Sequence, residues 1–194
     1  MMERYASMHR KTNETEVTLE LCLDGGERSV STGVGFFDHM LTAFAVHGGF
    51  GLKVKTVGDW EVDCHHTVED TGIVLGKAFA EALPTKRGIR RFGHAFIPMD
   101  EALAFAAADI SGRPFLVFAG EFPQERVGDF DTCMTEEFFR AFATNAGITL
   151  HLKCEYGKNS HHMIEALFKA AAHALRDAAA QEEGDVLLSS KGVL

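Results

Sequence analysis

Two short stretches of the sequence combine adjacent histidines with a glutamate. The pattern His-His-x-x-Glu runs from His65 to Glu69 and again from His161 to Glu165. Each copy opens a segment whose apolar residues recur at helical spacing, and residues i and i+4 of a helix lie on one face. The first histidine and the glutamate of each copy can therefore bind one metal ion together.

The second histidine of each copy, His66 or His162, points in a different direction. Successive residues of a helix are turned by about 100° from each other, so this histidine faces away from the first ion. Each copy thus offers ligands to two different ions. Imidazole nitrogen combined with carboxylate oxygen suits Mn, Fe or Zn better than Mg or Ca. The repeated pattern predicts a two-metal site, provided that the two copies meet.

Other candidate ligands lie on the segments around the two copies. His39 and Glu137 each lie near the start of the predicted helix that precedes a copy, and each can supply a further ligand. For Glu137, an exposed carboxylate favoured by the helix dipole is a simple alternative. His47 and His151 are explained as well by a helix end and a strand face. A single copy of the pattern could be a helix cap with a solvated face, but two copies at equivalent places favour metal binding.

The composition limits the class of protein. With 194 residues, 46% of them apolar, the chain can bury a sizeable core. A net charge of −9 argues against nucleic acid as a partner, because phosphate backbones are bound by clustered Lys and Arg. No apolar stretch has the length of a membrane span or a signal core, so no membrane partner is expected. The 4 cysteines, without a Cys-x-x-Cys pair, predict reduced thiols in a cytoplasmic protein.

The hydrophobic pattern predicts the elements that position the candidate ligands. In the first half we expect strands at 15–23, 52–57 and 60–64, and helices at 36–50 and from 65. In the second half we expect strands at 102–110, 114–122 and 148–156, and helices at 135–147 and from a Ser160 cap. These elements predict an α+β protein with an internal duplication of strand–strand–helix–strand–helix units. The half-repeats are 1–87 and 88–194, which together form one compact catalytic domain.

Several longer stretches, in this order, resemble one known family. They are FFDHML (36–41), DCHHTVEDTGIVLG (63–76), RFGHAFIPMDEAL (91–103), DISGRP (109–114), NAGITLH (145–151), GKNSHHMIEALFKAAAHAL (157–175) and SSKGVL (189–194). From about Glu14 to its last residue the chain resembles the imidazoleglycerol-phosphate dehydratases of histidine biosynthesis. The resemblance implies two mixed four-stranded sheets packed with helices, of the ribosomal protein S5 domain 2-like type.

The resemblance also implies an activity and its metal. A lyase of this family dehydrates D-erythro-imidazole glycerol phosphate to imidazole acetol phosphate, with two manganese ions per active site and an imidazolate/diazafulvene form of the substrate as intermediate. Two ligand sets follow, one for each ion: His65, Glu69, His161 and Glu165, and His39, His66, His162 and Glu137. Relatives often have histidine at position 137, and some have glutamine at position 43, where this chain has Glu137 and Ala43.

Further site residues follow from the same resemblance. Glu14 is expected to act as acid or base, with His66 and Glu165 as the other catalytic residues. The implied substrate-binding residues are Glu14, His39, His47, Arg91, Arg113, Ser189 and Lys191. Of these, the last four suit a phosphate group. Without the resemblance, Glu14 would be interpreted as a solvated carboxylate before a strand, and Lys191 as part of a solvated tail.

Assembly is the last expectation. The resemblance implies a homo-oligomer of twenty-four chains in octahedral symmetry, with active sites formed between subunits. Two alternatives remain open from the residues alone. One is a di-metal hydrolase that acts on a phosphate ester through metal-bound hydroxide. The other is a non-enzymatic assembly protein in which metal ions join subunits through histidine.

Overall fold

The computed structural model describes residues 4–192 of the chain. The first sheet is built from β1 (Tyr5–Lys11), β2 (Thr15–Cys22), β3 (Arg28–Ser31) and β4 (Gly51–Gly58). The second sheet is built from β5 (Phe92–Met99), β6 (Ala102–Asp109), β7 (Phe115–Ala119) and β10 (Thr149–Tyr156). The helices are α1 (Gly35–Gly48), α2 (His65–Ala82), α3 (Met134–Ala146) and α4 (Ser160–Ala179). A short hairpin of β8 (Arg126–Val127) and β9 (Phe130–Asp131) precedes α3.

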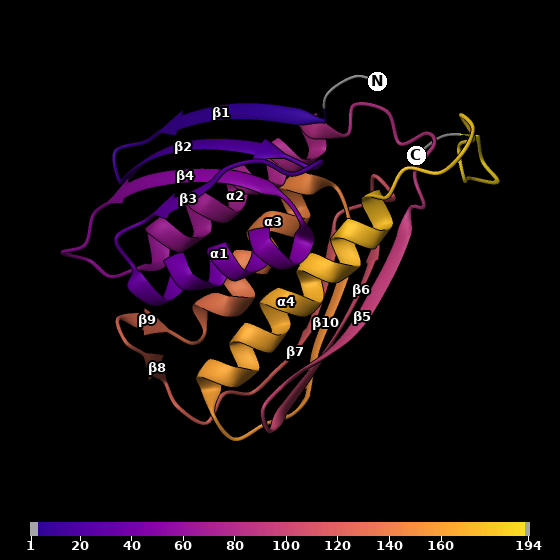
Figure 1. Ribbon diagram of the computed structural model, residues 1–194. Helices are drawn as coiled ribbons and strands as arrows, with labels where there is room; N and C mark the ends of the chain where they lie inside the picture. The colour runs from indigo at the N-terminus through magenta and orange to yellow at the C-terminus, as the bar shows by residue number, and fades with distance from the viewer. Residues whose placement is uncertain (1–3, 193–194) are drawn as a thin grey trace.

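The two sheets lie on the outside of the molecule and the helices lie between them (Figure 1). The first sheet, with strand order β1-β2-β4-β3, packs on α1 and α2, and the second, with order β5-β6-β10-β7, packs on α3 and α4. In the middle, α2 packs on α3 and α1 packs on α4. The α+β class with two mixed four-stranded sheets is confirmed.

The two sheets have equivalent connections. In each sheet the first two strands of the half form an antiparallel hairpin, and the long strand before the last helix pairs antiparallel with the second strand and parallel with the third. Each half therefore begins with three strands, one more than the predicted unit. The shared order supports a duplication divided near residue 87, whose superposition stays a prediction.

The predicted elements differ from the structure at a few places. The prediction missed the opening strands β1 and β5 as well as the short strand β3. Gly93 and Pro98 weaken the strand signal of β5, which lies at a sheet edge where proline is tolerated. The predicted strand at 60–64 is wrong, because a turn follows Gly58, in which the Val62 N–H donates to the Asp59 carbonyl at 3.0 Å. The side chain of Asn159, rather than Ser160, caps α4.

Small residues let the last helix approach the second sheet closely. The inner face of β6 is made only of alanines, which are buried against α4. On β5, a Cβ added to Gly93 would lie 2.0 Å from the Ala174 carbonyl oxygen, so only glycine fits there. This approach holds the C-terminal half of α4 against β5. None of the described helices is long and apolar enough to cross a membrane.

Candidate active site

Both His-His-x-x-Glu copies begin a helix, as the sequence predicts. His65 is the first residue of α2, and His161 is the second residue of α4. In each half the residue after the histidine pair packs on a glycine at the end of the preceding strand. A Cβ at Gly58 would lie 2.1 Å from Thr67 Oγ1, and one at Gly157 would lie 2.4 Å from Met163 Cγ. These glycines therefore place each pair of histidines directly at the end of a strand.

The second copy forms a compact group of potential metal ligands with α1. His39 Nε2 lies 3.5 Å and His161 Nε2 lies 3.2 Å from Glu165 Oε2. Among the described residues, these three side chains are the group of His, Cys, Asp and Glu whose ligand atoms all lie within 4.8 Å of one another. The sequence predicted the His161–Glu165 pair, and only the packing of α1 on α4 adds His39.

Glu165 is a charged carboxylate in a mostly buried place. Its side chain is 8% exposed, and Lys169 Nζ lies 2.7 Å from Glu165 Oε1. Burial works to raise the pKa of Glu165, but the bond from Lys169 and the nearby His39 and His161 outweigh it, so the pKa of Glu165 lies below its usual value. The carboxylate is thus held in the ionised form that a cation requires.

The first copy is more open and has a looser set of neighbours. His65 Nε2 lies 3.7 Å from Glu69 Oε2, and the Glu69 side chain is 44% exposed. His65 lines a hollow of about 450 Å³ together with Glu137 of α3. The Glu137 carboxylate is also paired with Arg140, at 3.6 Å. His39 and Glu137 therefore occupy corresponding places, each brought to a motif by a helix of the other half.

Neither of the two four-ligand sets implied by the resemblance comes together within residues 4–192, because the group around Glu165 contains none of the ligands of the first copy. His39 was assigned to one set and His161 with Glu165 to the other, yet these three lie together. Within one chain, the structure provides a three-ligand site at the second copy and a separate, incomplete site at the first.

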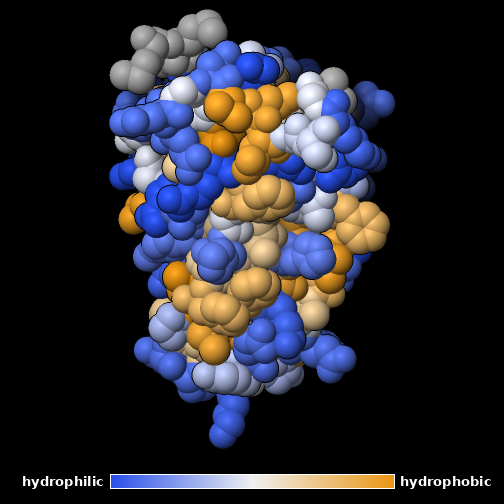
Figure 2. Space-filling view, turned by 90° about the vertical axis from the view of Figure 1, so that its right-hand side faces the viewer, coloured by the Kyte–Doolittle hydropathy of each residue, from blue (hydrophilic) through white to orange (hydrophobic). Residues whose placement is uncertain are grey.

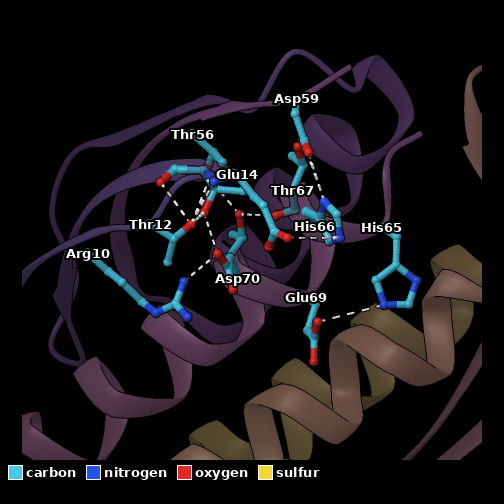
Figure 3. A network of polar contacts seen from close by, with 12 residues as sticks. Arg10, Thr12, Glu14, Thr56, Asp59, His65, His66, Thr67, Glu69 and Asp70 are labelled. Atoms are coloured by element: carbon cyan, nitrogen blue, oxygen red, sulfur yellow. Dashed lines mark hydrogen bonds and ion pairs between the residues drawn. The ribbon is translucent and has the colours of Figure 1, made fainter. Parts of the chain in front are cut away.

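His66 lies between two carboxylates that come from different segments (Figure 3). Its Nδ1 lies 3.0 Å from Asp59 Oδ2, and its Nε2 lies 3.8 Å from Glu14 Oε1. The hydrogen bond with Asp59 is the main cause that raises the pKa of His66. Glu14, predicted as acid or base, is therefore brought to the first motif by the β1–β2 turn, whereas Asp59 was missed by the sequence analysis.

His162 has the same kind of surroundings in the second half. Its Nδ1 lies 2.7 Å from Glu101 Oε2, and its Nε2 lies 3.6 Å from Asp100 Oδ2. Glu101 also accepts hydrogen bonds from the N–H groups of Lys158 and Asn159. The bond with His162, followed by these two, lowers the pKa of Glu101 to about 2, and the bond with Glu101 raises the pKa of His162. Both carboxylates lie in the stretch RFGHAFIPMDEAL, but the sequence alone assigned them no role.

The turn that carries Glu14 is held by a buried acid of α2 (Figure 3). Asp70 accepts hydrogen bonds from the Thr15 hydroxyl and from Arg10, and the Thr12 hydroxyl accepts from the N–H of Glu14 at 3.2 Å. Only 9% of the Asp70 side chain is exposed. These contacts fix the position of Glu14 relative to His66.

The candidate phosphate-binding residues gather around Asp109. Arg91 donates from Nε to Asp109 Oδ1 at 2.7 Å, and Arg113 Nη2 lies 3.7 Å from Asp109 Oδ2. Arg91 also donates to the Leu188 carbonyl, which brings the segment with Ser189 and Lys191 to the same region. The structure thus gathers the predicted cationic and polar residues at one place.

This region lies at the far end of the second sheet from the histidines. Glu101, the partner of His162, directly precedes the 8-residue strand β6, and Asp109 ends it. At ~3.3 Å per residue the strand separates them by roughly 25 Å. Likewise, Arg113 precedes β7, whereas Gly120, which lines the His65 hollow, follows it. The substrate that the resemblance implies, an imidazole joined to a phosphate by three carbons, cannot bridge this separation.

The remaining predicted residues lie along the contact of α1 and α4. His47 is close to His173, with ring centroids 5.5 Å apart, and burial is the main cause that lowers the pKa of both. Ala43 is buried between His39 and His47 on α1. The sequence analysis missed Lys169, although its spacing of four residues from Glu165 on a helix was a usable signal.

The donor set at Glu165 fits a divalent transition metal. Two imidazole nitrogens and one ionised, mostly buried carboxylate converge on one position, and this mixture suits Mn, Fe or Zn.

Comparison with known proteins gives one consistent result for the whole chain. The family model of imidazoleglycerol-phosphate dehydratase matches residues 32–175. An imidazoleglycerol-phosphate dehydratase from Acetivibrio thermocellus is 55% identical over 195 residues, and one from Bacillus cytotoxicus is 58% identical over 195 residues. Each alignment covers 100% of this chain and 100% of the relative.

Solved structures give the same answer. The crystal structure of imidazoleglycerol-phosphate dehydratase from Staphylococcus aureus matches with a TM-score of 0.84 and 41% identity, over 91% of this chain and 99% of that chain. The structure of the Pyrococcus furiosus protein matches with a TM-score of 0.84 and 37% identity, over 96% of this chain and 100% of that chain.

Proposed function

The chain belongs to the imidazoleglycerol-phosphate dehydratase family, a family of hydro-lyases in histidine biosynthesis, and from this premise we propose how its residues perform the dehydration. The observation that carries the proposal is the group of His39, His161 and Glu165 at the start of α4. It brings two imidazole nitrogens and one carboxylate together at the second His-His-x-x-Glu copy. We further propose a cytoplasmic location, in keeping with the absence of a membrane-spanning helix among the described residues.

The metal ligands of the proposal are the predicted histidines and carboxylates. His39, His161 and Glu165 hold one ion, and the second histidines and the ligands of the first copy complete a two-ion site. Manganese, when bound, supplies a Lewis acid that stabilises negative charge on the substrate imidazole and orients its hydroxyl group. The imidazolate/diazafulvene route of the substrate is part of this proposal.

Proton transfer is assigned to residues of the first half. Glu14 faces His66 Nε2 across 3.8 Å, and its turn is fixed by Asp70. A carboxylate in this place can accept the carbon-bound proton or return it to the leaving hydroxyl. His66 and Glu165 are the other proposed catalytic residues, with His66 orienting the substrate ring and Glu165 keeping one charged oxygen at the site.

The phosphate of the substrate is assigned to the region around Asp109. Arg91, Arg113, Ser189 and Lys191 offer fixed positive charge and hydrogen-bond donors in an acidic chain. Asp109 aligns the two arginines, whose forked donors suit a phosphate. Because these groups lie roughly 25 Å along β6 from the histidines, by the rise of ~3.3 Å per residue, they serve the histidines of a neighbouring chain.

A homo-oligomer follows from this separation. The outer face of the second sheet exposes Phe92 and Phe96 of β5 and Phe115 and Val117 of β7. Figure 2 shows that apolar surface gathers along the middle of this side of the molecule. Such a surface is typical of contacts between chains. We propose that it contributes to the assembly of twenty-four chains that the resemblance implies.

The activity is tested with imidazole glycerol phosphate and manganese. A keto product without released inorganic phosphate is expected, whereas phosphate release would indicate a hydrolase. Chelation should abolish turnover and give smaller assemblies by light scattering, because an ion that binds only joined chains stabilises them. Full activity in a metal-free monomer would contradict the proposal.

Sharing of the site between chains is tested by mixing two inactive variants. Chains with Arg113→Ala and Lys191→Ala lack the phosphate region, and chains with Glu165→Gln lack the metal site. Reassembled together, they should regain the activity expected from random mixing, since some sites combine the intact halves of both variants. No recovery above the separate variants would show that each chain forms its own site.

A further inference from the structure

The second histidine of each motif is held by a carboxylate that the duplication does not explain. His66 Nδ1 lies 3.1 and 3.0 Å from the two oxygens of Asp59, in the turn after β4 (Figure 3). His162 Nδ1 lies 2.7 Å from Glu101, in the turn between β5 and β6. The two carboxylates come from different places in the repeat, yet they contact the same ring nitrogen.

This contact determines which nitrogen can bind a cation. A neutral imidazole carries one N–H, and a carboxylate at Nδ1 places the proton there and leaves the Nε2 lone pair free. The opposite carboxylates do not occupy Nε2, because Glu14 is 3.8 Å from His66 Nε2 and Asp100 is 3.6 Å from His162 Nε2. Both distances exceed those of N–H···O hydrogen bonds.

The holding carboxylates are themselves fixed. Glu101 Oε1 accepts the N–H groups of Lys158 at 3.0 Å and Asn159 at 2.8 Å, just before α4, while Oε2 holds the imidazole. Asp59 lies in a turn closed by the Val62 N–H on its own carbonyl at 3.0 Å, and its side chain is 22% exposed. Each ring is therefore oriented by the chain before any ligand binds.

The first histidines are oriented differently. His65 and His161 approach the glutamate four residues later through Nε2, at 3.7 and 3.2 Å. In those pairs the shared cation can align both side chains. The second histidines have no such pairing: Asp70, four residues after His66, is bonded to Thr15 and Arg10, and His162 has Ala166 at that spacing. Their direction depends on another contact.

We propose that Asp59 and Glu101 are positioning residues that present Nε2 of His66 and His162 to metal. This inference rests on the proposed function, in which His66 and His162 are metal ligands. It adds a carboxylate–histidine pair to each half of the protein. Partners of this kind typically change metal affinity by about 10- to 100-fold.

The test measures manganese binding by the metal-free protein, with free manganese counted by electron paramagnetic resonance. Asp59→Ala and Glu101→Ala should each weaken binding by about 10- to 100-fold. Asp59→Asn keeps an oxygen that accepts the Nδ1 proton, so it should recover most of this loss. Glu101→Gln keeps one oxygen for either the imidazole or the N–H groups of Lys158 and Asn159, so it should recover only part of the loss. Glu61→Gln removes the same charge from the same turn and should bind as the wild type does.

The outcomes distinguish a failure of the metal assignment from a failure of the positioning role alone. If His66→Ala and His162→Ala leave manganese affinity unchanged, the metal assignment fails and the positioning role fails with it. If those variants weaken binding but Asp59→Ala and Glu101→Ala do not, only the positioning role is overturned. Equal losses in the alanine and amide variants would also overturn it, because charge rather than orientation would then be responsible. Melting temperatures within the wild-type range confirm that each variant is folded.

Discussion

The two copies of one motif have become different sites. At the start of α4, His161 and Glu165 are joined by His39, and the carboxylate is 8% exposed. At the start of α2, His65 and Glu69 are 3.7 Å apart, and the Glu69 side chain is 44% exposed. The same five-residue pattern therefore gives a compact ligand group in one half and an open pair in the other.

The partner helix, and not the motif, determines which ligands gather at each copy within one chain. Each copy receives a helix from the other half, since α1 packs on α4 and α3 packs on α2. The first of these helices supplies an imidazole, and the second supplies Glu137, which is paired with Arg140 at 3.6 Å. The open copy therefore receives a carboxylate from its partner helix where the compact copy receives an imidazole. In the proposed assembly, we therefore expect the open copy to be the one that depends on a neighbouring chain.

The largest effect should come from Glu165. In Glu165→Gln, we expect dehydration to fall by about 10⁴-fold, because the ionised oxygen of the ligand group is lost. After its metal is removed with a chelator and manganese is added again, this variant should no longer bind the tightest manganese ion. Metal analysis after gel filtration counts the bound ions. Glu69→Gln is the matched variant in the open copy and should keep that first ion. Loss of the same ion in both variants would show that the two copies do not differ in metal binding.

Glu14 should give the next largest effect. Glu14→Gln should lower kcat by roughly 10²- to 10³-fold, in the range of general acid–base contributions, while metal content stays unchanged. Glu16→Gln is a control two residues away in β2, where Glu16 pairs with His9 and Lys11. Steady-state kinetics with metal analysis measures both quantities. A wild-type rate in Glu14→Gln would remove it from the acid–base role.

The pH dependence of metal binding tests the second histidine of each copy. The bonds to Asp59 and Glu101 raise the pKa values of His66 and His162. In the metal-free protein, these pairs stabilise the fold below the ordinary histidine pKa of about 6.5, and this contribution is lost as pH rises through the raised values. Metal requires neutral imidazole, so its affinity changes in the opposite direction.

Manganese affinity should therefore weaken as pH falls through those raised values, by about tenfold per pH unit for each proton that competes. Affinity measured across this range in the wild type and in Glu101→Gln gives the comparison. The variant should keep its affinity to lower pH, because the pKa of His162 is no longer raised. An identical profile in both proteins would contradict this assignment.

The smallest effect should come from making the copies more alike. Glu137→His would give α3 the imidazole that α1 has, and it would remove the pairing with Arg140. We expect the second manganese to bind a few-fold more tightly, an effect of about 1 kcal/mol or less. Calorimetric titration of the metal-free protein measures both binding steps. Arg140→Gln controls for the loss of the ion pair alone.

The local chemistry was predictable from the sequence because it depends on neighbours in the chain. Residues four apart on a helix share a face, so the pairs His65–Glu69 and His161–Glu165 follow from spacing. The divergence of the second histidines follows in the same way. The helices over 36–50 and 135–147 were also predictable, because Gly49 and Gly147 end them in the left-handed conformation.

Weak or missing local signals account for the errors in the fold. The edge strand β5 contains Gly93 and Pro98, which the sheet edge and the close approach of α4 explain only in three dimensions. The apolar residues of segment 60–64 alternate as in a strand, but the backbone forms a turn after Gly58. In this turn the Val62 N–H donates to the Asp59 carbonyl and not to a neighbouring strand. Alternation alone does not reveal whether a partner strand exists.

Sequence alone determined which side chains could bind metal, in which pairs, and at the start of which helices, because helical spacing is a local property. Only the tertiary structure decided which of them meet. His39 reaches Glu165, Asp59 reaches His66 and Glu101 reaches His162 through contacts between separate elements. It also decided that the arginines around Asp109 lie at the opposite end of β6 from the histidines. Such distances depend on how helices and sheets pack, and residue spacing along the chain does not encode them directly.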